Sequence, residues 1–426
     1  MLEGYKNYKE TNIPWLKKMP SHWNSDRAKM MYLKMNRQVN INDDVITCFR
    51  DGVVTLRKNR RTTGFTESIK EIGYQGIKEG DLVIHVMDAF AGAIGVSDSN
   101  GKGTPVYSVC EAKNDFYNNH YYAYIIREMA KNGFILSLYR GIRERSSDFR
   151  YEVFRKQILP IPPRSEQDQI VRYLDWKISM INKYIEAKKK QIELLKEQKQ
   201  ALINEMLTKN KGEKIKFKHR FKLFRGLNIT KEDLLDSGIP CISYGEIHLK
   251  YGFEVNPNIH LLRCVDKRYL KTNPTSLMKY GDFAFADTSE DIAGSGNFTF
   301  LNSNTQAFAG YHTIIARPNK EINYRYFAYY FDSILFRKQI QQNVNGVKVY
   351  SITQRILNDA YILLPLEDKQ KSVVIYLDQQ CECIDKLVNK INKEIELFTE
   401  YRTCLISDVV TGKVNVQLVE AREVVV

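Results

Sequence analysis

The sequence YLDWKISMINKYIEAKKKQIELLKEQKQALINEMLT, residues 173–208, occurs a second time in diverged form as YLDQQCECIDKLVNKINKEIELFTEYRTCLISDVVT, residues 376–411. The two stretches align without a gap at a constant offset of 203 residues, and Pro162 matches Pro365 at the same offset. Both begin with Tyr-Leu-Asp and contain Ile-Glu-Leu near the middle. A gapless match of this length indicates an internal duplication.

Each copy has the apolar spacing of a long amphipathic helix. Ser165, with acids in the following turn and Pro160–Pro163 before it, predicts a helix start, and the first helix is expected over about 166–208. Apolar residues then recur at alternating steps of three and four, and Lys188 and Lys199 fill two seam positions. The predicted seam residues are Ile178, Ile181, Ile185, Ile192, Leu195 and Leu202 in the first copy, and Ile384, Val388, Ile391, Ile395, Phe398 and Leu405 in the second.

Neither helix can bury its apolar stripe alone, so the simplest arrangement has each helix covering the stripe of the other. A second seam, formed with another protein, is also compatible with the spacing. The alternative that each helix is ordinary domain core stays open. Length, heptad spacing and duplication together favour a spacer made of two paired helices.

Two larger blocks precede the two helices and resemble each other more loosely. Gly80-Asp81-Leu82-Val83 is similar to Gly281-Asp282-Phe283-Ala284. Strands are predicted at Asp81–Val86, Phe298–Leu301, Thr313–Ala316 and Tyr361–Leu364, and helices at Tyr121–Met129 and Tyr324–Lys338. Both blocks are therefore expected to have an α/β or mixed α+β fold. The predicted segments are a first block at 1–163, a first spacer helix at 164–212, a second block at 213–365, a second spacer helix at 366–413 and a tail at 414–426.

The composition is that of a folded, basic protein. Hydrophobic residues make up 43% of the 426 residues, which is enough for real cores. The formal net charge of +14 favours nucleic acid or an anionic membrane as partner. Leu2–Lys18 is mixed and polar, so we expect no signal peptide, and no apolar run suggests a transmembrane helix. Seven scattered cysteines suit free thiols, so we predict a cytoplasmic protein that does not bind membranes.

Basic and aromatic residues cluster in expected loops of both blocks. Arginine can bind guanine through a two-pronged contact, and lysine or arginine can bind phosphates. A single charge run is more often a solvated face, but similar clusters in both blocks favour contact with double-stranded DNA. The candidate DNA-binding residues are Arg57, Lys58, Arg60, Arg61, Arg140, Arg143 and Arg145 in the first block, and Tyr244, Arg263, Lys267, Arg268, Lys348 and Tyr350 in the second.

Motifs for catalysis are missing from the sequence. There is no G-x-x-x-x-G-K-[ST] loop, no Asn/Asp-Pro-Pro-Tyr/Phe tetrapeptide of an amino-methyltransferase and no H-E-x-x-H. Cys381 and Cys383 lie in the repeated helix without a second ligand pair, so a zinc site is not expected. Phe90–Gly95 is only weakly similar to a Gly-rich nucleotide loop. Asp287, Glu290 and Asp291 fit ordinary loop acids better than a nuclease site. We therefore predict no catalytic residues and no metal site.

Several of these stretches resemble those of a known family, the specificity (S) subunits of type I restriction-modification enzymes. Ile13–Leu16 with Met19–Trp23 resembles the opening of the family, and residues 226–234 and 238–247 resemble the start of a target recognition domain. Leu159–Pro163, followed by Glu166-Gln167, is similar to the family's boundary into its repeated helix. The second copy departs there, because Asp368-Lys369 stands where Glu-Gln is expected.

The resemblance implies two target recognition domains, each reading half of a split DNA site, separated by two long antiparallel coiled-coil helices in a pseudo-twofold internal repeat. The helices would set the gap and dock two methyltransferase (M) subunits, which bring S-adenosylmethionine and flip an adenine. Two restriction (R) subunits, where the system has them, would add ATP-driven cleavage. This chain itself would be non-catalytic and hold no cofactor. The alternatives are a protein-binding coiled-coil adaptor and a DNA methyltransferase or nuclease with degenerate motifs.

Overall fold

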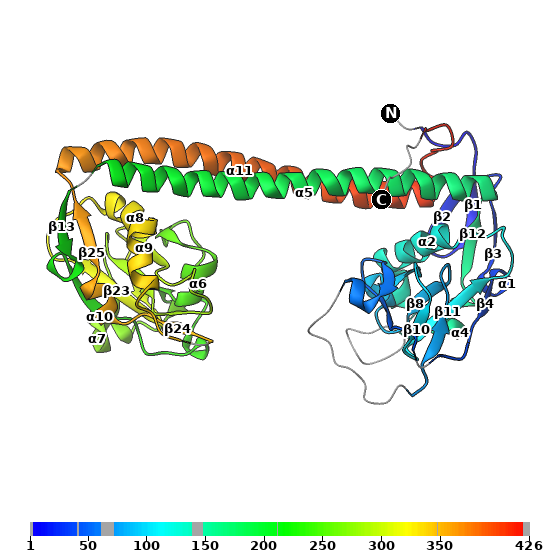
Figure 1. Cartoon of the computed structure of the whole chain (residues 1–426), viewed down its shortest axis with the longest axis horizontal. Coiled ribbons are helices and arrows are strands. Elements are labelled where there is room, and N and C mark those ends of the chain that lie inside the picture. Colours follow the sequence, from blue (N-terminus) through cyan, green and yellow to red (C-terminus); the bar gives the residue numbers. More distant parts are fainter. Residues whose placement is uncertain are drawn as a thin grey trace. The chain divides into compact units, whose positions relative to one another are not determined.

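The computed structural model describes residues 3–40, 42–60, 72–138, 148–210, 212–346 and 348–420. The chain divides into two compact units (Figure 1): the first unit is residues 1–188 with 393–426, and the second unit is residues 189–392. Both units are mixed α+β, as predicted, and both contain part of two long helices, α5 (Arg164–Lys209) and α11 (Glu367–Val410). The predicted domain segments kept each helix whole, whereas the compact units divide both helices. Helix α5 begins at Arg164, so Ser165 lies inside its first turn and not before it.

The first unit is built on a four-stranded antiparallel sheet. Its strand order is β4 (Tyr32–Lys34), β11 (Tyr107–Ala112), β8 (Leu82–His85) and β9 (Ile94–Val96). Four further strands pair as β5 (Ile46–Cys48) with β6 (Val54–Leu56) and β7 (Gln75–Ile77) with β10 (Gly101–Gly103). The short helices are α1 (Ala28–Met31), α3 (Phe134–Ser137) and α4 (Tyr151–Phe154), with single turns at Arg57–Asn59 and Ala89–Ala91.

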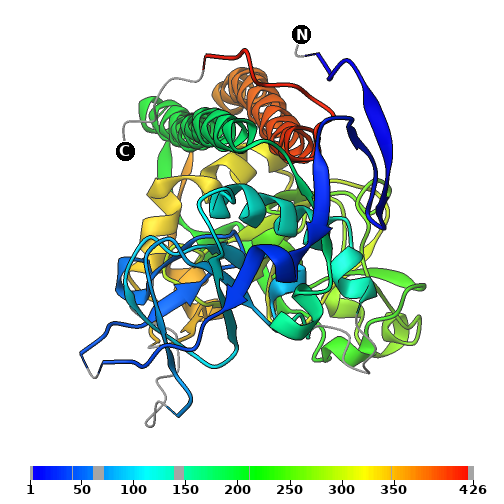
Figure 2. The ribbon, with the colours of Figure 1, turned by 90° about the vertical axis from the view of Figure 1, so that its right-hand side faces the viewer.

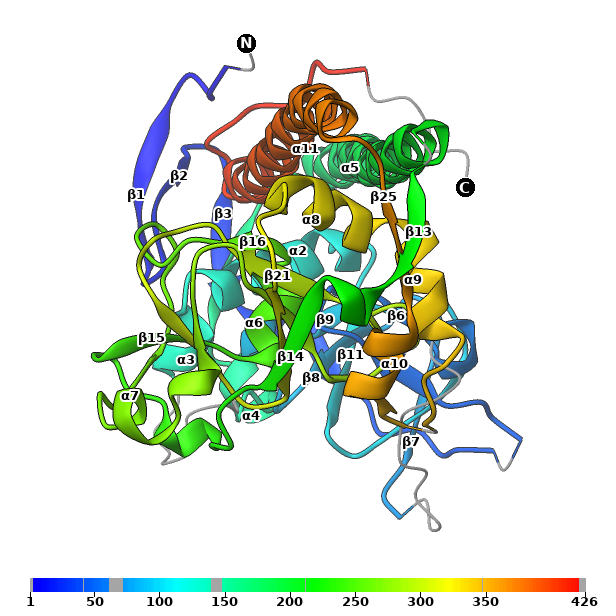
Figure 3. The ribbon, with the colours of Figure 1, turned by 90° about the vertical axis from the view of Figure 1, so that its left-hand side faces the viewer.

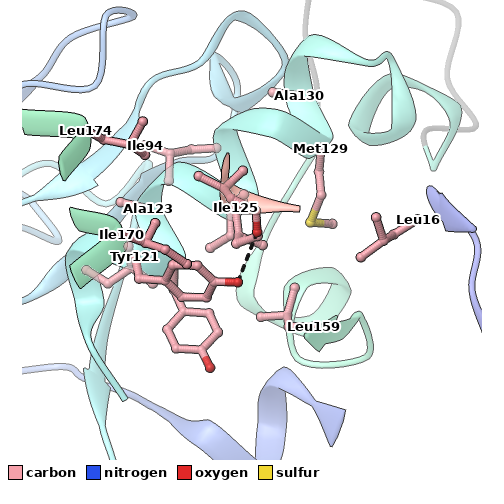
Figure 4. Close-up of a cluster of buried hydrophobic side chains, with 14 of the residues drawn as sticks. Leu16, Ile94, Tyr121, Ala123, Ile125, Met129, Ala130, Leu159, Ile170 and Leu174 are labelled. Carbon is pink, nitrogen blue, oxygen red and sulfur yellow. Dashed lines mark hydrogen bonds between the residues drawn. The ribbon is translucent and has the colours of Figure 1, made fainter. Parts of the chain in front are cut away.

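Helix α2 (Asn119–Lys131) joins this sheet to the long helices. The Asn118 side chain caps its start by accepting from the backbone N–H groups of His120 and Tyr121. Tyr121 is fully buried, and Figure 4 shows its ring among side chains that include Ile170 and Leu174 of α5. The Tyr121 hydroxyl donates to the carbonyl of Val410 in α11 at 3.1 Å. One helix of the block therefore packs against both long helices.

The N-terminal segment and the C-terminal tail contact each other in the first unit. A hairpin of β1 (Tyr8–Ile13) and β2 (Leu16–Pro20) runs beside the helix pair (Figure 2). The backbone N–H of Asn415 donates to the carbonyl of Glu3 at 2.8 Å, which ties the C-terminal tail to the start of the chain. Strand β3 (Asn24–Arg27) then pairs with β12 (Ile158–Ile161), the last strand before α5.

The second unit has a similar plan with a larger sheet. Strand β13 (Glu213–Lys216) pairs with β25 (Tyr361–Leu364), which precedes α11 as β12 precedes α5. The five-stranded sheet has the order β14 (Phe221–Arg225), β23 (Thr313–Pro318), β19 (Phe283–Ala286), β21 (Phe298–Leu301) and β16 (Phe253–Val255). A four-stranded sheet has the order β17 (Cys264–Val265), β15 (Ile239–Ile242), β22 (Ala307–Ala309) and β18 (Leu277–Met278). Strand β20 (Thr288–Ser289) pairs with β24 (Tyr350–Ser351).

Two helices stand where the sequence predicted one at Tyr324–Lys338. Helix α8 (Tyr324–Asp332) ends at Ser333, and α9 (Ile334–Gln341) begins after it. Ser333 has extended backbone angles, and its hydroxyl donates to the carbonyl of Tyr330, so this residue breaks the helix. Figure 3 shows α8 beside the long helices, where it occupies the place that α2 has in the first unit. The remaining helices are α6 (Tyr244–Leu249), α7 (Tyr269–Thr272) and α10 (Gln354–Asp359), with single turns at Phe217–His219, Lys231–Asp233 and Pro274–Ser276.

The repeated Gly-Asp motif forms the same turn in both blocks. Gly80 and Gly281 both have a positive φ, +87° and +83°, which favours glycine. The following aspartates accept from the backbone N–H groups of Lys78 and Lys279 at 2.7 and 2.9 Å. Each aspartate also binds an arginine, Arg37 for Asp81 and Arg317 for Asp282. The motif is therefore structural, and it supports a common origin of the blocks.

Candidate nucleic-acid interface

The two long helices pack against each other in opposite directions. In the first unit, the ring of Tyr184 lies 4.4 Å from that of Phe398, and Lys188 Nζ lies 2.8 Å from Glu394 Oε2. Residue numbers fall along α11 as they rise along α5, which is the signature of an antiparallel pair. In the second unit, Lys199 Nζ pairs with Asp385 at 2.7 Å, and the same relation holds.

The predicted seam residues lie on the inner side of this pair. Ile181, Ile185, Ile192, Ile384, Ile391 and Leu405 are buried, and Ile178, Leu195, Leu202, Val388, Ile395 and Phe398 are half-buried. Truncating one buried isoleucine to alanine costs about 2–5 kcal/mol in a well-packed core. The sequence analysis missed Ile203 and Leu207, which are fully buried in the core of the second unit.

One contact of the seam occurs twice. Arg402 is the repeat equivalent of Lys199, and Asn182 is the equivalent of Asp385, at the offset of 203 residues. Arg402 Nη1 donates to Asn182 Oδ1 at 2.5 Å in the first unit, as Lys199 Nζ donates to Asp385 in the second. The duplication is therefore visible in the contacts of the helix pair as well as in its sequence.

The Tyr-Leu-Asp repeat anchors each block to its helix. In the first unit the hydroxyl of Tyr124 in α2 donates to Asp175 Oδ1 at 2.8 Å. In the second unit the hydroxyl of Tyr329 in α8 donates to Asp378 Oδ1 at 2.6 Å. Burial raises the pKa of both tyrosines above the ordinary value, and the adjacent aspartates raise these pKa values further. Each tyrosine therefore remains a neutral donor.

The start of each long helix explains what the repeat keeps and what it changes. Gln167 and Gln370 are equivalent, and each side-chain amide donates to a carbonyl five residues earlier, of Pro162 at 2.9 Å and of Pro365 at 2.8 Å. The expected Glu-Gln therefore corresponds to Lys369-Gln370, one residue beyond the Asp368-Lys369 that the sequence analysis compared. The glutamine is retained, and only the glutamate is lost.

Glu166 has a role that exists only in the first unit. Its carboxylate accepts from the Tyr5 hydroxyl at 2.9 Å and from Trp23 Nε1 at 2.9 Å, and it lies 2.6 Å from His22 Nε2. These three partners belong to the N-terminal segment of the chain. The equivalent position in the second unit, Lys369, follows a block that has no such segment before it.

The candidate basic residues of the first block are partly engaged with acids. Lys58 Nζ lies 2.5 Å from Asp44 Oδ2, and Arg60 binds Asp51 while its guanidinium lies 4.7 Å from the ring centroid of Phe49. Arg60 lowers the pKa of Asp51 through this contact. Arg57 is half-buried, and its Nε donates weakly to Thr47 at 3.4 Å. Surface pairs of this kind are worth about 0–1 kcal/mol, so phosphates can compete with the acids. Arg61, Arg140, Arg143 and Arg145 lie outside the described residues.

The candidate residues of the second block fall in two places, the first of which is the loop around α7. Lys267 and Arg268 are exposed there, and the Arg268 guanidinium lies 5.1 Å from the ring centroid of Tyr269. Arg263 instead donates to the carbonyl of Leu234 at 2.7 Å and lies 3.6 Å from Asp236. Arg263 therefore holds a neighbouring loop, whereas Lys267 and Arg268 present charge to solvent.

The second place is an aromatic cluster at the start of α6. The ring centroid of Tyr244 lies 5.6 Å from that of Tyr311 and 5.4 Å from that of His312. His312 has a positive φ of 56°, and its Nδ1 lies 3.2 Å from Asp287 Oδ1. Tyr350 is half-buried and lies in β24, which pairs with β20, the strand that begins directly after Asp287. Exposed Lys348 lies two residues before Tyr350. The sequence analysis missed Tyr311 and His312, although Tyr311-His312 directly precedes a predicted strand.

Comparison with known proteins agrees with this architecture. Residues 228–397 match the family model described as type I restriction modification DNA specificity domain. The MjaVIII specificity subunit of a type I restriction enzyme from Methanocaldococcus jannaschii is 22% identical over 326 residues, covering 72% of this chain and 73% of that protein. The chain is therefore similar to type I restriction-modification specificity subunits, and residues 228–397 match their DNA specificity domain.

Solved structures with the same fold include specificity subunits. A chain from a study of complex assembly and conformational transition of the type I restriction-modification system superposes with a TM-score of 0.69 at 14% identity, covering 93% of this chain and 99% of that one. The HsdS subunit from Thermoanaerobacter tengcongensis gives a TM-score of 0.51 at 14% identity, covering 93% and 98%. The chain thus shares the two-block, two-helix fold of these structures.

The described part of the chain shows neither a cluster of side chains that could hold a metal ion nor a membrane-spanning helix. Among residues 3–420, outside the gaps given above, no group of three or more histidine, cysteine, aspartate or glutamate side chains is placed to hold a metal ion. None of the helices in the same ranges is long and apolar enough to span a membrane.

Proposed function

We propose that this chain is a type I restriction-modification specificity subunit that reads a bipartite DNA site, with the first block contacting one half-site and the second block the other, while α5 and α11 set the gap between them. The observation that carries the proposal is the pairing of equivalent anchors with different surfaces. Both blocks join their helices through the same tyrosine–aspartate and glutamine–carbonyl contacts. Their outer loops, by contrast, have diverged in sequence. Two blocks that attach to the helices in the same way but expose different loops suit the reading of two different DNA sequences.

The chemistry of the second block suits DNA. Lys267 and Arg268 offer exposed positive charge for phosphates, which position a protein on DNA without reading its sequence. The Tyr244 cluster offers aromatic faces and hydrogen-bonding groups that can reach bases. In the first block, Lys58 and Arg60 are in weak surface ion pairs and are available to phosphates on the same grounds. The recognised bases depend on loop geometry in the complex.

The helices also carry a repeated face that burial does not explain. Lys190, Glu193, Leu194 and Glu197 in α5 are identical to Lys393, Glu396, Leu397 and Glu400 in α11, and all eight side chains are exposed. Leu194 is 65% exposed and Leu397 is 56% exposed. An identical exposed leucine with charged neighbours at equivalent points of both helices offers the same surface twice. Because the face occurs once on each helix, we propose that it docks two copies of one partner, the methyltransferase subunits.

In this proposal the chain is non-catalytic. S-adenosylmethionine would be bound by the methyltransferase subunits, and ATP by restriction subunits where the system has them. The compartment we propose is the cytoplasm, since all seven cysteines are free thiols. A coiled-coil adaptor without DNA contact would have the same helices, but it would leave the exposed cations of both blocks without a role.

Co-expression with a methyltransferase subunit, followed by mapping of methylated adenines on genomic DNA, tests the DNA-reading proposal. The expected result is one motif made of two specific halves around a gap of fixed length and variable sequence. A contiguous motif, or methylation without sequence preference, would contradict the proposal.

The docking face is tested separately by native mass spectrometry of the complex. We expect Leu194→Glu and Leu397→Glu each to reduce the complex from two methyltransferase subunits to one, and the double variant to bind none. Lys196→Gln and Thr399→Ser, at equivalent exposed positions outside this face, are controls that should leave two bound. Retention of two subunits by the double leucine variant would exclude this face.

A further inference from the structure

The first unit contains a cavity of about 780 Å³ between its block and its part of the long helices. The weakly nucleotide-like stretch Phe90–Gly95 lies along one wall, with Phe90 and Ile94. Helix α2 contributes Arg127, and the long helices contribute Ile178 and Arg402. All lining residues belong to the first unit. The volume falls within the range of small-molecule sites, about 300–1,000 Å³.

Arg127 is the residue that makes this cavity unusual. Arg127 is half-buried, and burial lowers the pKa of Arg127, whereas the nearby Tyr124, Asp51 and Cys48 raise that pKa and the charge of Arg402 lowers it. In the described part of the chain, no acid lies within ion-pair distance of Arg127, and its guanidinium has no hydrogen-bond partner. A buried cation without a partner is costly, since it has lost water and gained nothing in return.

Gly52 provides the space for the Arg127 guanidinium. A Cβ at Gly52 would lie 2.3 Å from Arg127 Nη1. Gly52 also has a positive φ of +90°, which favours glycine. The backbone of this loop thus leaves the Arg127 side chain room at the cavity wall.

Acids near the cavity are already engaged. Asp51 is bound by Arg60, and Asp175 accepts from Tyr124. Glu128 accepts from Ser407 at 2.7 Å. None of these three acids lies within ion-pair distance of Arg127, although Asp51 interacts with its charge over a longer distance, so an external anion in direct contact with Arg127 would be stabilised there.

The internal repeat provides a built-in comparison, because the second unit neutralises the equivalent charges. Aligning the Asn118 and Asn323 caps places Asp332 at the position of Arg127, and Asp332 pairs with Arg337 at 3.2 Å. Lys199, the equivalent of Arg402, pairs with Asp385, whereas Arg402 meets only the neutral amide of Asn182. Both differences make the recess of the first unit more positive than its counterpart.

We propose that this cavity binds a small phosphate-bearing molecule of the nucleotide class, with its phosphate beside Arg127 and Arg402 and its planar organic part on the Phe90–Ile94 wall. Two guanidinium groups suit a phosphate because their paired N–H donors match its oxygens. The apolar wall favours a ligand with an organic part over a free inorganic ion. A phosphate of the DNA backbone has the same charge, but the depth of Arg127 favours a free molecule. The proposal does not depend on the proposed reading of a bipartite site.

Isothermal titration of the full-length chain with inorganic phosphate, AMP and ATP tests this assignment. We expect saturable binding at one site, tighter for AMP or ATP than for inorganic phosphate. Asn182→Asp restores the acid that the second unit has at this place, so it should keep the fold and weaken binding at least about tenfold. Arg127→Leu should have a similar effect. Asp385→Asn, the matched change in the second unit, should leave binding unchanged.

Three results would overturn the assignment. The first is no binding of any of the three compounds at millimolar concentration. The second is equal affinity of the wild-type chain and a folded Asn182→Asp variant, with folding checked by thermal unfolding. The third is competitive displacement of the nucleotide by duplex DNA of unrelated sequence, which would assign the recess to a backbone phosphate.

Discussion

Replacing the aspartate of the Tyr-Leu-Asp anchor should loosen one block from its helix and leave the other block unaffected. Asp378 accepts from Tyr329 at 2.6 Å and from Arg325 Nε at 2.5 Å. A hydrogen bond to a charged group contributes about 1.5–3 kcal/mol, and an exposed ion pair about 0–1 kcal/mol. Because the Asp378 and Arg325 side chains are 35% and 34% exposed, the arginine contact belongs near the lower figure. We therefore expect Asp378→Ala to cost about 2–3 kcal/mol.

The internal repeat supplies the control for this experiment. Asp175 accepts only the Tyr124 hydroxyl among the contacts described, so Asp175→Ala should cost the hydrogen-bond contribution alone, about 1.5–3 kcal/mol. Hydrogen exchange measured by mass spectrometry separates the two units. Asp378→Ala should speed exchange in α8 and leave α2 unchanged, and Asp175→Ala should do the reverse. Equal acceleration in both helices, or none in either, would refute the idea that each aspartate anchors its own block.

Three further predictions concern other sites. Glu166→Gln removes a charged acceptor from Tyr5, His22 and Trp23, so proteases should cut the N-terminal segment faster. Lys369→Gln, at the equivalent position of the second copy, should leave the rate of proteolysis unchanged. An unchanged rate for Glu166→Gln would contradict the role of Glu166. Burial lowers the pKa of His85 below its unfolded value of about 6.5, so the unfolded chain binds more protons than the folded chain. The free energy of unfolding should therefore fall as the pH drops through that value. His85→Gln should flatten this pH dependence in urea unfolding, and an identical pH profile would refute the role of His85. Burial raises the pKa of Cys48 and Cys241 to about 12, whereas Cys383 and Cys404 are exposed. Of these four thiols, only Cys383 and Cys404 should react rapidly with a thiol reagent at neutral pH. Rapid reaction of Cys48 or Cys241 would show that their environment is open to solvent.

Much of the fold follows from the sequence because the duplication is long and local. Heptad spacing and a constant offset were enough to predict both long helices and their shared seam. Short apolar runs between turn residues predicted β21, β23 and β25 at or near their observed bounds. The break at Ser333 was missed, since serine within an amphipathic stretch is common and its extended backbone depends on packing around it.

The candidate site was less predictable because it depends on contacts between distant segments. Arginine is a residue type that often contacts DNA, but Arg263 donates to the carbonyl of Leu234 and so holds that loop. No motif in the sequence singled out Tyr124 and Tyr329, whose hydroxyls donate to Asp175 and Asp378. One signal was available in the sequence: Asn118 and Asn323 both precede aromatic helices, and aligning these two residues places Tyr124 opposite Tyr329.

The central claim is that the helix pair fixes the distance between two half-sites that the blocks read separately. Because α5 and α11 are antiparallel, seven residues inserted at matched points of both helices keep the heptad phase and lengthen the pair by about 10 Å. Mapping methylated adenines in cells that express this variant with a methyltransferase subunit is the most direct test. We predict unchanged half-sites around a gap longer by about three base pairs, at roughly 3.4 Å each. An unchanged gap with methylation retained, or altered half-sites, would contradict the account.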